Sequence, residues 1–135
     1  MKTLTVLGAG AWGTALALTA ARAGTKVHLW GRSLDPQTHF KNLKIDTTPE
    51  TFEMIPSLHQ ALHQTQAIVL AMPAQSVRGF LGQYQAVIPR DVTVILACKG
   101  IEIATGALIG DVVTQICPGY DVAVLGGGNL AQEVI

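Results

Sequence analysis

Short continuous runs of apolar residues alternate along this chain with stretches whose apolar positions repeat at helical spacing. The first pattern is typical of strands buried on both faces of a parallel sheet, and the second of helices with one buried face. The predicted strands are residues 3–7, 26–30, 67–71, 92–97 and 121–125. The predicted helices are residues 11–23, 57–64, 76–87 and 105–116, and another begins near the end of the chain. Such alternation predicts right-handed crossovers in an α/β fold.

Residues 33–56 have the weakest pattern, because they hold three prolines and little periodicity. We expect a short edge strand over residues 44–47. With it, the predicted fold class is a doubly wound parallel α/β sheet of strand order 3-2-1-4-5-6. A ligand is expected at the carboxyl ends of the first and fourth strands, where the order reverses.

A glycine-rich turn, Gly-Ala-Gly-Ala-Trp-Gly over residues 8–13, joins the first predicted strand to the first predicted helix. Gly8 permits the tight turn, Gly10 lets a pyrophosphate approach the backbone, and Gly13 lets the helix lie close to the strand. The unpaired N–H groups of the helix would face the phosphates. This context favours a Rossmann dinucleotide-binding fold over a glycine turn in an unrelated α/β domain.

Composition and charge narrow the class of protein. The 135 residues are expected to form one domain, residues 1–135, with 49% hydrophobic and 13% charged residues. Nine basic and nine acidic residues give no electrostatic basis for binding nucleic acid or an anionic membrane. No apolar run reaches membrane-spanning length, and a strand at the N-terminus predicts no signal peptide. The two cysteines lack metal or redox spacing, which favours a reducing cytoplasm.

Five segments resemble the N-terminal domain of glycerol-3-phosphate dehydrogenases. They are Gly-Ala-Gly-Ala-Trp-Gly-Thr-Ala-Leu-Ala at 8–17, Leu-Trp-Gly-Arg at 29–32, Val-Leu-Ala-Met-Pro-Ala-Gln at 69–75, Cys-Lys-Gly-Ile-Glu at 98–102 and Gly-Gly-Gly-Asn-Leu-Ala-Gln-Glu-Val at 126–134. The resemblance implies hydride transfer between dihydroxyacetone phosphate and sn-glycerol 3-phosphate with NADP or NAD, as in phospholipid precursor synthesis. It also admits a homodimer.

The resemblance assigns roles to individual residues. Lys99 would line the cleft shared by the nicotinamide and the substrate, and is the candidate catalytic residue. The substrate would also contact Gly127 and Asn129. The expected cofactor-binding residues are Gly8, Gly10, Ala11, Trp12, Gly13, Arg32, Pro73, Lys99 and Ala131.

The sequence departs from the family pattern in three ways. Gly126-Gly127-Gly128 replaces a Ser-Gly-Pro, the stretch before Ser57 is short, and the sequence stops at Ile135. The resemblance places the proton-donating lysine and most of the phosphate-binding side chains in a helical second domain. We therefore expect the 135 residues alone to lack activity.

Several residues have a simpler interpretation beside the functional one. Arg32 stands where an acidic residue would grip a ribose 2′-hydroxyl, so it favours a 2′-phosphate unless it is only a surface arginine. Lys99 could merely end a strand, as could Pro73. We expect no metal at His59 and His63, because the residue after His59 is glutamine.

Three further side chains have two interpretations. Cys98 is either a thiol of lowered pKa beside Lys99 or a small buried residue at a strand end. Glu133 either touches the cofactor or caps a helix, and Trp12 is expected to support the turn by packing. Two other functions remain open: a ketopantoate- or pyrroline-carboxylate-type reductase, and a dinucleotide-binding module without catalysis.

Overall fold

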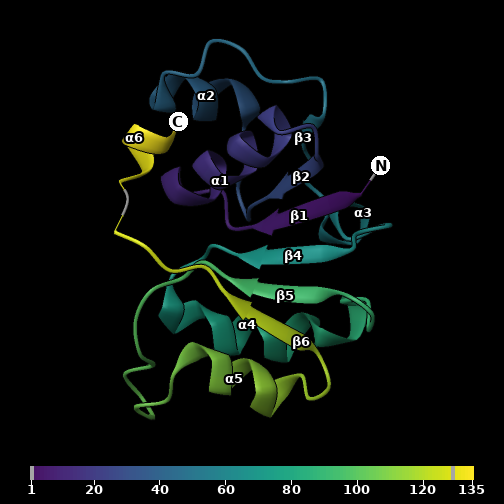
Figure 1. The fold of residues 1–135 in the computed structure, drawn as a ribbon, viewed down its shortest axis with the longest axis vertical. Coiled ribbons are helices and arrows are strands. Elements are labelled where there is room, and N and C mark those ends of the chain that lie inside the picture. Colours follow the sequence, from purple (N-terminus) through teal and green to yellow (C-terminus); the bar gives the residue numbers. More distant parts are fainter. Residues whose placement is uncertain (1, 129) are drawn as a thin grey trace.

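Six parallel strands form the centre of the molecule in a computed structural model that describes residues 2–128 and 130–135 (Figure 1). The sheet order is β3-β2-β1-β4-β5-β6, as predicted. The strands are β1 (Thr3–Leu7), β2 (Lys26–Trp30), β3 (Phe52–Met54), β4 (Ala67–Leu70), β5 (Thr93–Leu96) and β6 (Asp121–Val124). Because β1 pairs with both β2 and β4, the order reverses at β1 and β4.

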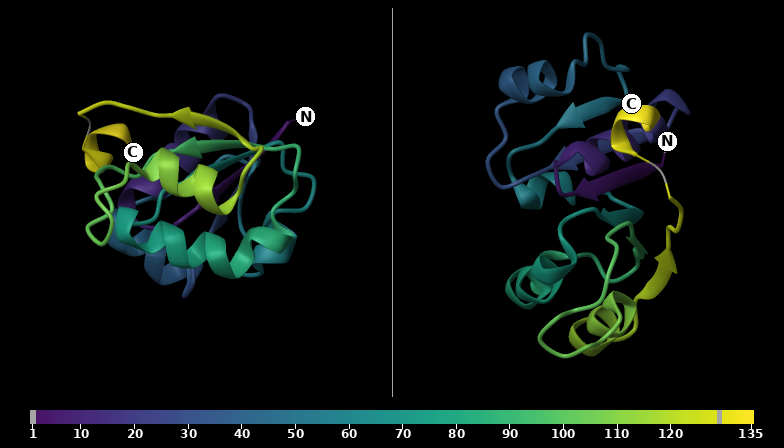
Figure 2. Two further views of the ribbon diagram at one scale, coloured as in Figure 1. Left: turned by 90° about the horizontal axis from the view of Figure 1, so that it is seen from below. Right: turned by 90° about the vertical axis from the view of Figure 1, so that its left-hand side faces the viewer.

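Helices cover both faces of this sheet. They are α1 (Ala11–Arg22), α2 (Pro36–Leu43), α3 (Leu58–Ala61), α4 (Val77–Tyr84), α5 (Ile109–Ile116) and α6 (Ala131–Val134), with 3₁₀ turns η1 (Ala74–Ser76) and η2 (Gln85–Val87) on either side of α4. The short α6 lies beside α1, where Arg22 donates a hydrogen bond of 2.7 Å to the carbonyl of Ile135 (Figure 2).

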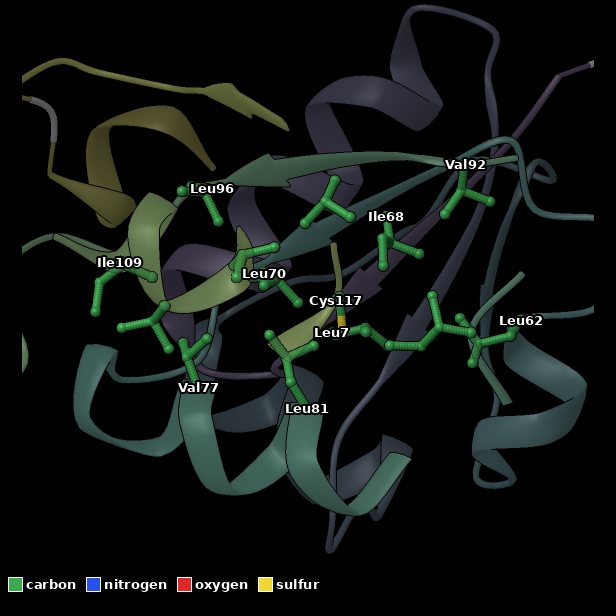
Figure 3. Close-up of a cluster of buried hydrophobic side chains, with 14 of the residues drawn as sticks. Leu7, Leu62, Ile68, Leu70, Val77, Leu81, Val92, Leu96, Ile109 and Cys117 are labelled. Atoms are coloured by element: carbon green, nitrogen blue, oxygen red, sulfur yellow. The ribbon is translucent and has the colours of Figure 1, made fainter. Parts of the chain in front are cut away.

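Two hydrophobic cores result, one on each face of the sheet. Neighbouring residues of a strand point to opposite faces, and so Val6 and Leu7 of β1 enter different cores, both with no exposed surface. Leu7 packs with Leu70, Val77 and Leu81 in the core beneath α4 and α5 (Figure 3). The continuous apolar runs of β1, β2 and β4 thus reflect burial on both sides, whereas β6 at the edge of the sheet is exposed.

The prediction of an edge strand at residues 44–47 is wrong. The edge strand is β3, in which buried Phe52 pairs with Val27, and residues 36–43 form the unpredicted helix α2. The start of α2 carries a recognisable signal, because the Asp35 carboxylate accepts a hydrogen bond of 3.2 Å from the Thr38 N–H and Pro36 follows directly. Tertiary pairing with β2, rather than the local sequence, selects the strand.

The helix predicted from residue 105 starts later, at Ile109. Residues 101–108 instead form a small loop closed by an antiparallel bridge between Ile101 and Leu108. Two backbone hydrogen bonds shape it, from the Glu102 N–H to the Ala107 carbonyl (2.9 Å) and from the Gly106 N–H to the Glu102 carbonyl (2.8 Å). The helix predicted at 57–64 is also shorter, although Ser57 caps it as expected.

The turn between β1 and α1 depends on two glycines. Gly8 has a φ of +117°, and a Cβ added there would lie 2.7 Å from the backbone of Ala71 and Met72. A Cβ added to Gly13 would lie 1.9 Å from the Gly8 carbonyl oxygen. Side chains at these positions would therefore push α1 away from the sheet.

Replacing Gly13 by alanine should destabilise the fold, because the methyl group would overlap the Gly8 carbonyl oxygen at 1.9 Å. Overpacking of this kind costs about 3 kcal/mol, measurable by urea unfolding. Gly82→Ala is the matched control, since nothing lies within 4 Å of a Cβ added there in α4. It should add about 0.5–1 kcal/mol through better helix propensity. Equal stability of Gly13→Ala and wild type would refute this packing of α1.

Candidate functional site

A cavity of about 900 Å³ opens at the carboxyl ends of β1 and β4, where the strand order reverses. Open α/β sheets bind their ligands at this place. Its wall comes from the turn after β1, the ends of β2, β4 and β5, and one side of α4. The lining residues include Gly8–Trp12, Trp30–Arg32, Ala71–Ala74, Phe80, Tyr84, Ala97–Lys99, Leu130 and Ala131.

The N-terminus of α1 faces this cavity without a side-chain cap. Gly10 occupies the N-cap position, and nothing lies within 4 Å of a Cβ added to it. The first turn of α1 also carries no acidic residue, so no carboxylate there opposes the positive end of the helix dipole. An anion could therefore reach the N–H groups of the turn directly.

The charges in the cavity favour an anionic ligand. Among the described residues that line it, the charged ones are Arg32 and Lys99, and both are cationic. Arg32 follows β2 on an exposed stretch, and Lys99 follows β5. The two side chains therefore come from opposite halves of the sheet, with the α1 turn between them in the strand order.

Trp12 lines the large cavity and also a smaller one of about 200 Å³. Its indole N–H donates a hydrogen bond of 3.2 Å to the Ala97 carbonyl, so it ties α1 to the end of β5. This contact bears out a packing role for Trp12. Lys99 and Trp12 line both cavities, whereas Gly127 lines only the smaller one.

The structure thus brings most of the predicted site residues together. Gly8, Gly10, Ala11, Trp12, Arg32, Pro73, Lys99 and Ala131 line the large cavity. Gly13 is buried beneath the turn, where it supports the geometry. Asn129 lies outside the described residues.

Sequence reasoning missed the aromatic wall of the cavity. Phe80 and Tyr84 of α4 line the cavity together with Trp30, and Phe80 also packs against the core. Their ring centroids lie 5.6 Å apart for Trp30 and Phe80, and 5.0 Å apart for Phe80 and Tyr84. The spacing of two aromatic residues one turn apart on α4 could have signalled a continuous surface.

The resemblance includes Glu102 without assigning it a role, yet its side chain is buried, with 5% exposed. The Arg78 Nε–H lies 3.0 and 2.9 Å from its two carboxylate oxygens, and the Thr105 hydroxyl donates a third hydrogen bond of 2.6 Å. These hydrogen bonds, Arg78 first, lower the pKa of the Glu102 carboxyl. The pair fastens the loop after Lys99 to α4.

The remaining candidates have structural explanations. Burial raises the pKa of the Cys98 thiol, which supports a small strand-end residue rather than a reactive thiolate. In the part of the chain that the structure describes, no three His, Cys, Asp or Glu side chains gather as a metal site, His59 and His63 included. Glu133 lies in the first turn of α6, outside the residues that line either cavity.

Comparison with known proteins decides the family. Residues 3–135 match the family described as NAD-dependent glycerol-3-phosphate dehydrogenase N-terminus. The chain belongs to this family. It is 34% identical over 143 residues to glycerol-3-phosphate dehydrogenase [NAD(P)+] of Corynebacterium glutamicum, covering 99% of the chain and 43% of that relative. The chain therefore spans less than half the length of this curated relative.

Solved structures agree with the fold. The crystal structure of glycerol-3-phosphate dehydrogenase from Coxiella burnetii superposes with a TM-score of 0.84 at 28% identity, over 98% of this chain and 43% of that one. Pyrroline carboxylate reductase from Plasmodium falciparum, solved with NADP bound, gives a TM-score of 0.64 at 19% identity, over 91% and 41%. The second likeness shows the fold alone. Across residues 2–128 and 130–135, every helix is too short or too polar to cross a bilayer.

Acidification should destabilise wild type more than Glu102→Gln. The pKa of this carboxyl is lowered on folding, so its contribution is present above the unfolded-state pKa and is lost as the pH falls through the folded-state pKa. Urea unfolding from neutral pH to about pH 3 measures the difference. Glu50→Gln, at an exposed glutamate, should keep the wild-type pH dependence. Parallel curves for wild type and Glu102→Gln would contradict this role of the ion pair.

Proposed function

We propose that residues 1–135 are the cofactor-binding domain of an oxidoreductase that interconverts sn-glycerol 3-phosphate and dihydroxyacetone phosphate with NADP or NAD. The observation that carries the proposal is the uncapped N-terminus of α1 at a cavity of about 900 Å³. Arg32 and Lys99 make that cavity cationic. A dinucleotide supplies the pyrophosphate, the adenosine ribose and the nicotinamide that such a cavity can hold.

The proposed contacts follow the geometry of the wall. The pyrophosphate would lie on the N–H groups around Gly10, Ala11 and Trp12, with Gly8 and Gly13 shaping the turn beneath. Arg32 would pair with a 2′-phosphate on the adenosine ribose. Pro73, Lys99 and Ala131 would border the nicotinamide. All three line the cavity, Pro73 after β4, Lys99 after β5 and Ala131 as the first residue of α6.

Lys99 is the proposed catalytic residue. When bound, the reduced nicotinamide supplies a hydride to the ketone carbon of the substrate. The Lys99 ammonium would stabilise negative charge that develops on the ketone oxygen. Gly127, which shares the smaller cavity with Lys99, and Asn129 are the proposed neighbours of the substrate.

The other proposals concern the longer protein. We infer that a helical domain outside these 135 residues supplies a proton donor and the side chains that bind the substrate phosphate. We also infer that the small-molecule substrate is phosphorylated. A homodimer and a cytoplasmic location are also proposed, the second because Cys98 and Cys117 are free thiols. We propose no nucleic-acid partner, since the chain carries no net charge. We propose no insertion into a membrane, since no apolar run of the sequence reaches membrane-spanning length.

A dinucleotide-binding module without catalysis is the second candidate. It is favoured by one observation: among the described residues that line the large cavity, Lys99 is the one cationic group at the expected nicotinamide end. Catalysis requires the carbonyl, the hydride and a proton donor to be positioned together. The two candidates differ in turnover, not in cofactor binding.

Gly10→Val should abolish binding of NADPH while the protein stays folded. The valine would stand in open space at the N-cap and so block the approach to the turn. Isothermal titration calorimetry measures the affinity, and circular dichroism checks the fold. Gly82→Val is the matched control, because Gly82 lies in α4 away from the cavity lining. Wild-type affinity in Gly10→Val would remove this turn from the proposed site.

Arg32→Ala should weaken NADPH binding and leave NADH binding nearly unchanged. A charge-assisted hydrogen bond contributes about 1.5–3 kcal/mol, which corresponds to a loss of at least about tenfold in affinity. Arg90→Ala provides a control, since Arg90 stacks on Tyr120 away from the cavity lining. If NADH binds more tightly than NADPH and Arg32→Ala changes neither affinity, the 2′-phosphate contact does not exist.

The 135 residues alone should not oxidise NADPH in the presence of dihydroxyacetone phosphate. The described residues position Lys99 but no phosphate clamp beside it. Absorbance at the nicotinamide band measures turnover, with a full-length relative as the positive control. Turnover that disappears in Lys99→Ala would show instead that these residues are a complete catalyst.

A further inference from the structure

The loop that carries Lys99, residues 98–108, has few apolar contacts with the core, which come from Cys98 and Ala107 at its two ends. Ile101 is 52% exposed, Ile103 is 84% exposed and Leu108 is 59% exposed. Hydrophobic burial is the usual anchor of a segment on a protein surface. Here the three largest aliphatic side chains ahead of α5 contribute little of it, so the middle of the loop, between Cys98 and Ala107, depends on polar contacts for its position.

Gln75 supplies the first of these contacts from the 3₁₀ turn η1. Its side-chain N–H₂ donates a hydrogen bond of 2.8 Å to the Ile101 carbonyl, and its side-chain oxygen accepts one of 2.9 Å from the Ile103 N–H. A planar amide bonded at both ends fixes the orientation of the backbone as well as its distance. The neighbours of Gln75 in η1, Ala74 and Ser76, line the large cavity.

Glu102 supplies the second contact from between these two bonded residues. Its carboxylate turns inward, and Arg78 and Thr105 satisfy it with hydrogen bonds of 2.6 to 3.0 Å. Arg78 also donates a hydrogen bond of 2.9 Å to the Gln115 side chain, so α4, the loop and α5 are connected through one guanidinium. Glu102 is the acidic residue of the loop and stands three positions after Lys99. Arg78 balances its negative charge.

Lys99 therefore lies between two anchors. Before it, the Ala97 carbonyl accepts the hydrogen bond of the Trp12 indole. After it, Gly100 turns the chain with a φ of +116° into the segment that Gln75 and Glu102 hold. Both anchors hold the chain on either side of Lys99 rather than its side chain. They therefore restrict the position of the Lys99 backbone.

We propose that Gln75, Arg78 and Glu102 are positioning residues that set the place of Lys99 at the cavity. The inference rests on the proposed function, in which Lys99 borders the nicotinamide. Gln75 holds the backbone after Lys99, and the Arg78–Glu102 pair holds the same loop against α4. Loss of either contact lets Lys99 leave the nicotinamide end without disturbing the glycine turn that binds the pyrophosphate.

The test observes Lys99 directly by nuclear magnetic resonance. Reductive methylation with ¹³C-formaldehyde labels lysine amines and keeps their charge, and Lys99→Arg identifies the Lys99 signal. In wild type, NADPH should shift this signal. In Gln75→Ala the shift should fall by at least about half, while the NADPH affinity changes by less than about threefold, because the turn and Arg32 are intact. Gln85→Ala, an exposed glutamine with no contact to the loop, should behave as wild type.

Glu102→Gln is the second variant and should reduce the shift in the same way. Because both variants release one loop, the double variant should show less than the sum of the two effects. An unchanged Lys99 shift in folded Gln75→Ala and Glu102→Gln overturns the proposal. If wild type binds no NADPH, the proposed function fails instead. In that case the Lys99 signal of the cofactor-free variants decides. If the contacts position the loop, the chemical shift and linewidth of this signal differ from those of wild type. If they do not, both stay as in wild type, and the proposal is wrong.

Discussion

The close approach of α1 to the turn after β1 is the constraint on which the rest of this structure depends. Gly13 lies against the Gly8 carbonyl, and Gly8 lies against the backbone at the end of β4, with no room for a Cβ at either position. This contact places the first N–H groups of α1 at the carboxyl edge of the sheet. It also brings Trp12 onto the end of β5, so the phosphate-binding turn and the Lys99 loop share one boundary.

Polar side chains then fix the parts of the site that the cores do not reach. The strands and the large helices are held by apolar cores on both faces of the sheet. The loop after β5 contacts the core through Cys98 and Ala107, but it exposes its three largest aliphatic residues, and Gln75, Arg78 and Glu102 hold its middle. Directional hydrogen bonds define a single geometry, whereas exposed apolar side chains do not. Such a segment can be placed accurately without being part of the core.

The electrostatic character of the cavity comes from its distribution of charge rather than from the total. The chain has no net charge, yet the charged side chains that line the cavity among the described residues are both cationic. Glu102, the acidic residue of the Lys99 loop, is turned inward onto Arg78. With the uncapped end of α1, this arrangement suits a ligand with several negative charges.

The sequence by itself determined the six-stranded order and the turn chemistry, because buried parallel strands and glycine-dependent contacts leave local patterns in the chain. It also located Arg32 and Lys99, each of which stands two positions after a predicted strand. It missed β3, whose position is decided by pairing with β2, and the aromatic cavity wall of Phe80 and Tyr84, because periodicity cannot tell a core from a cavity. The role of Glu102 was equally hidden: only the tertiary structure brings Arg78, 24 residues away in the sequence, to its carboxylate. Such long-range contacts are set by how helices pack across the sheet, and no local pattern encodes them.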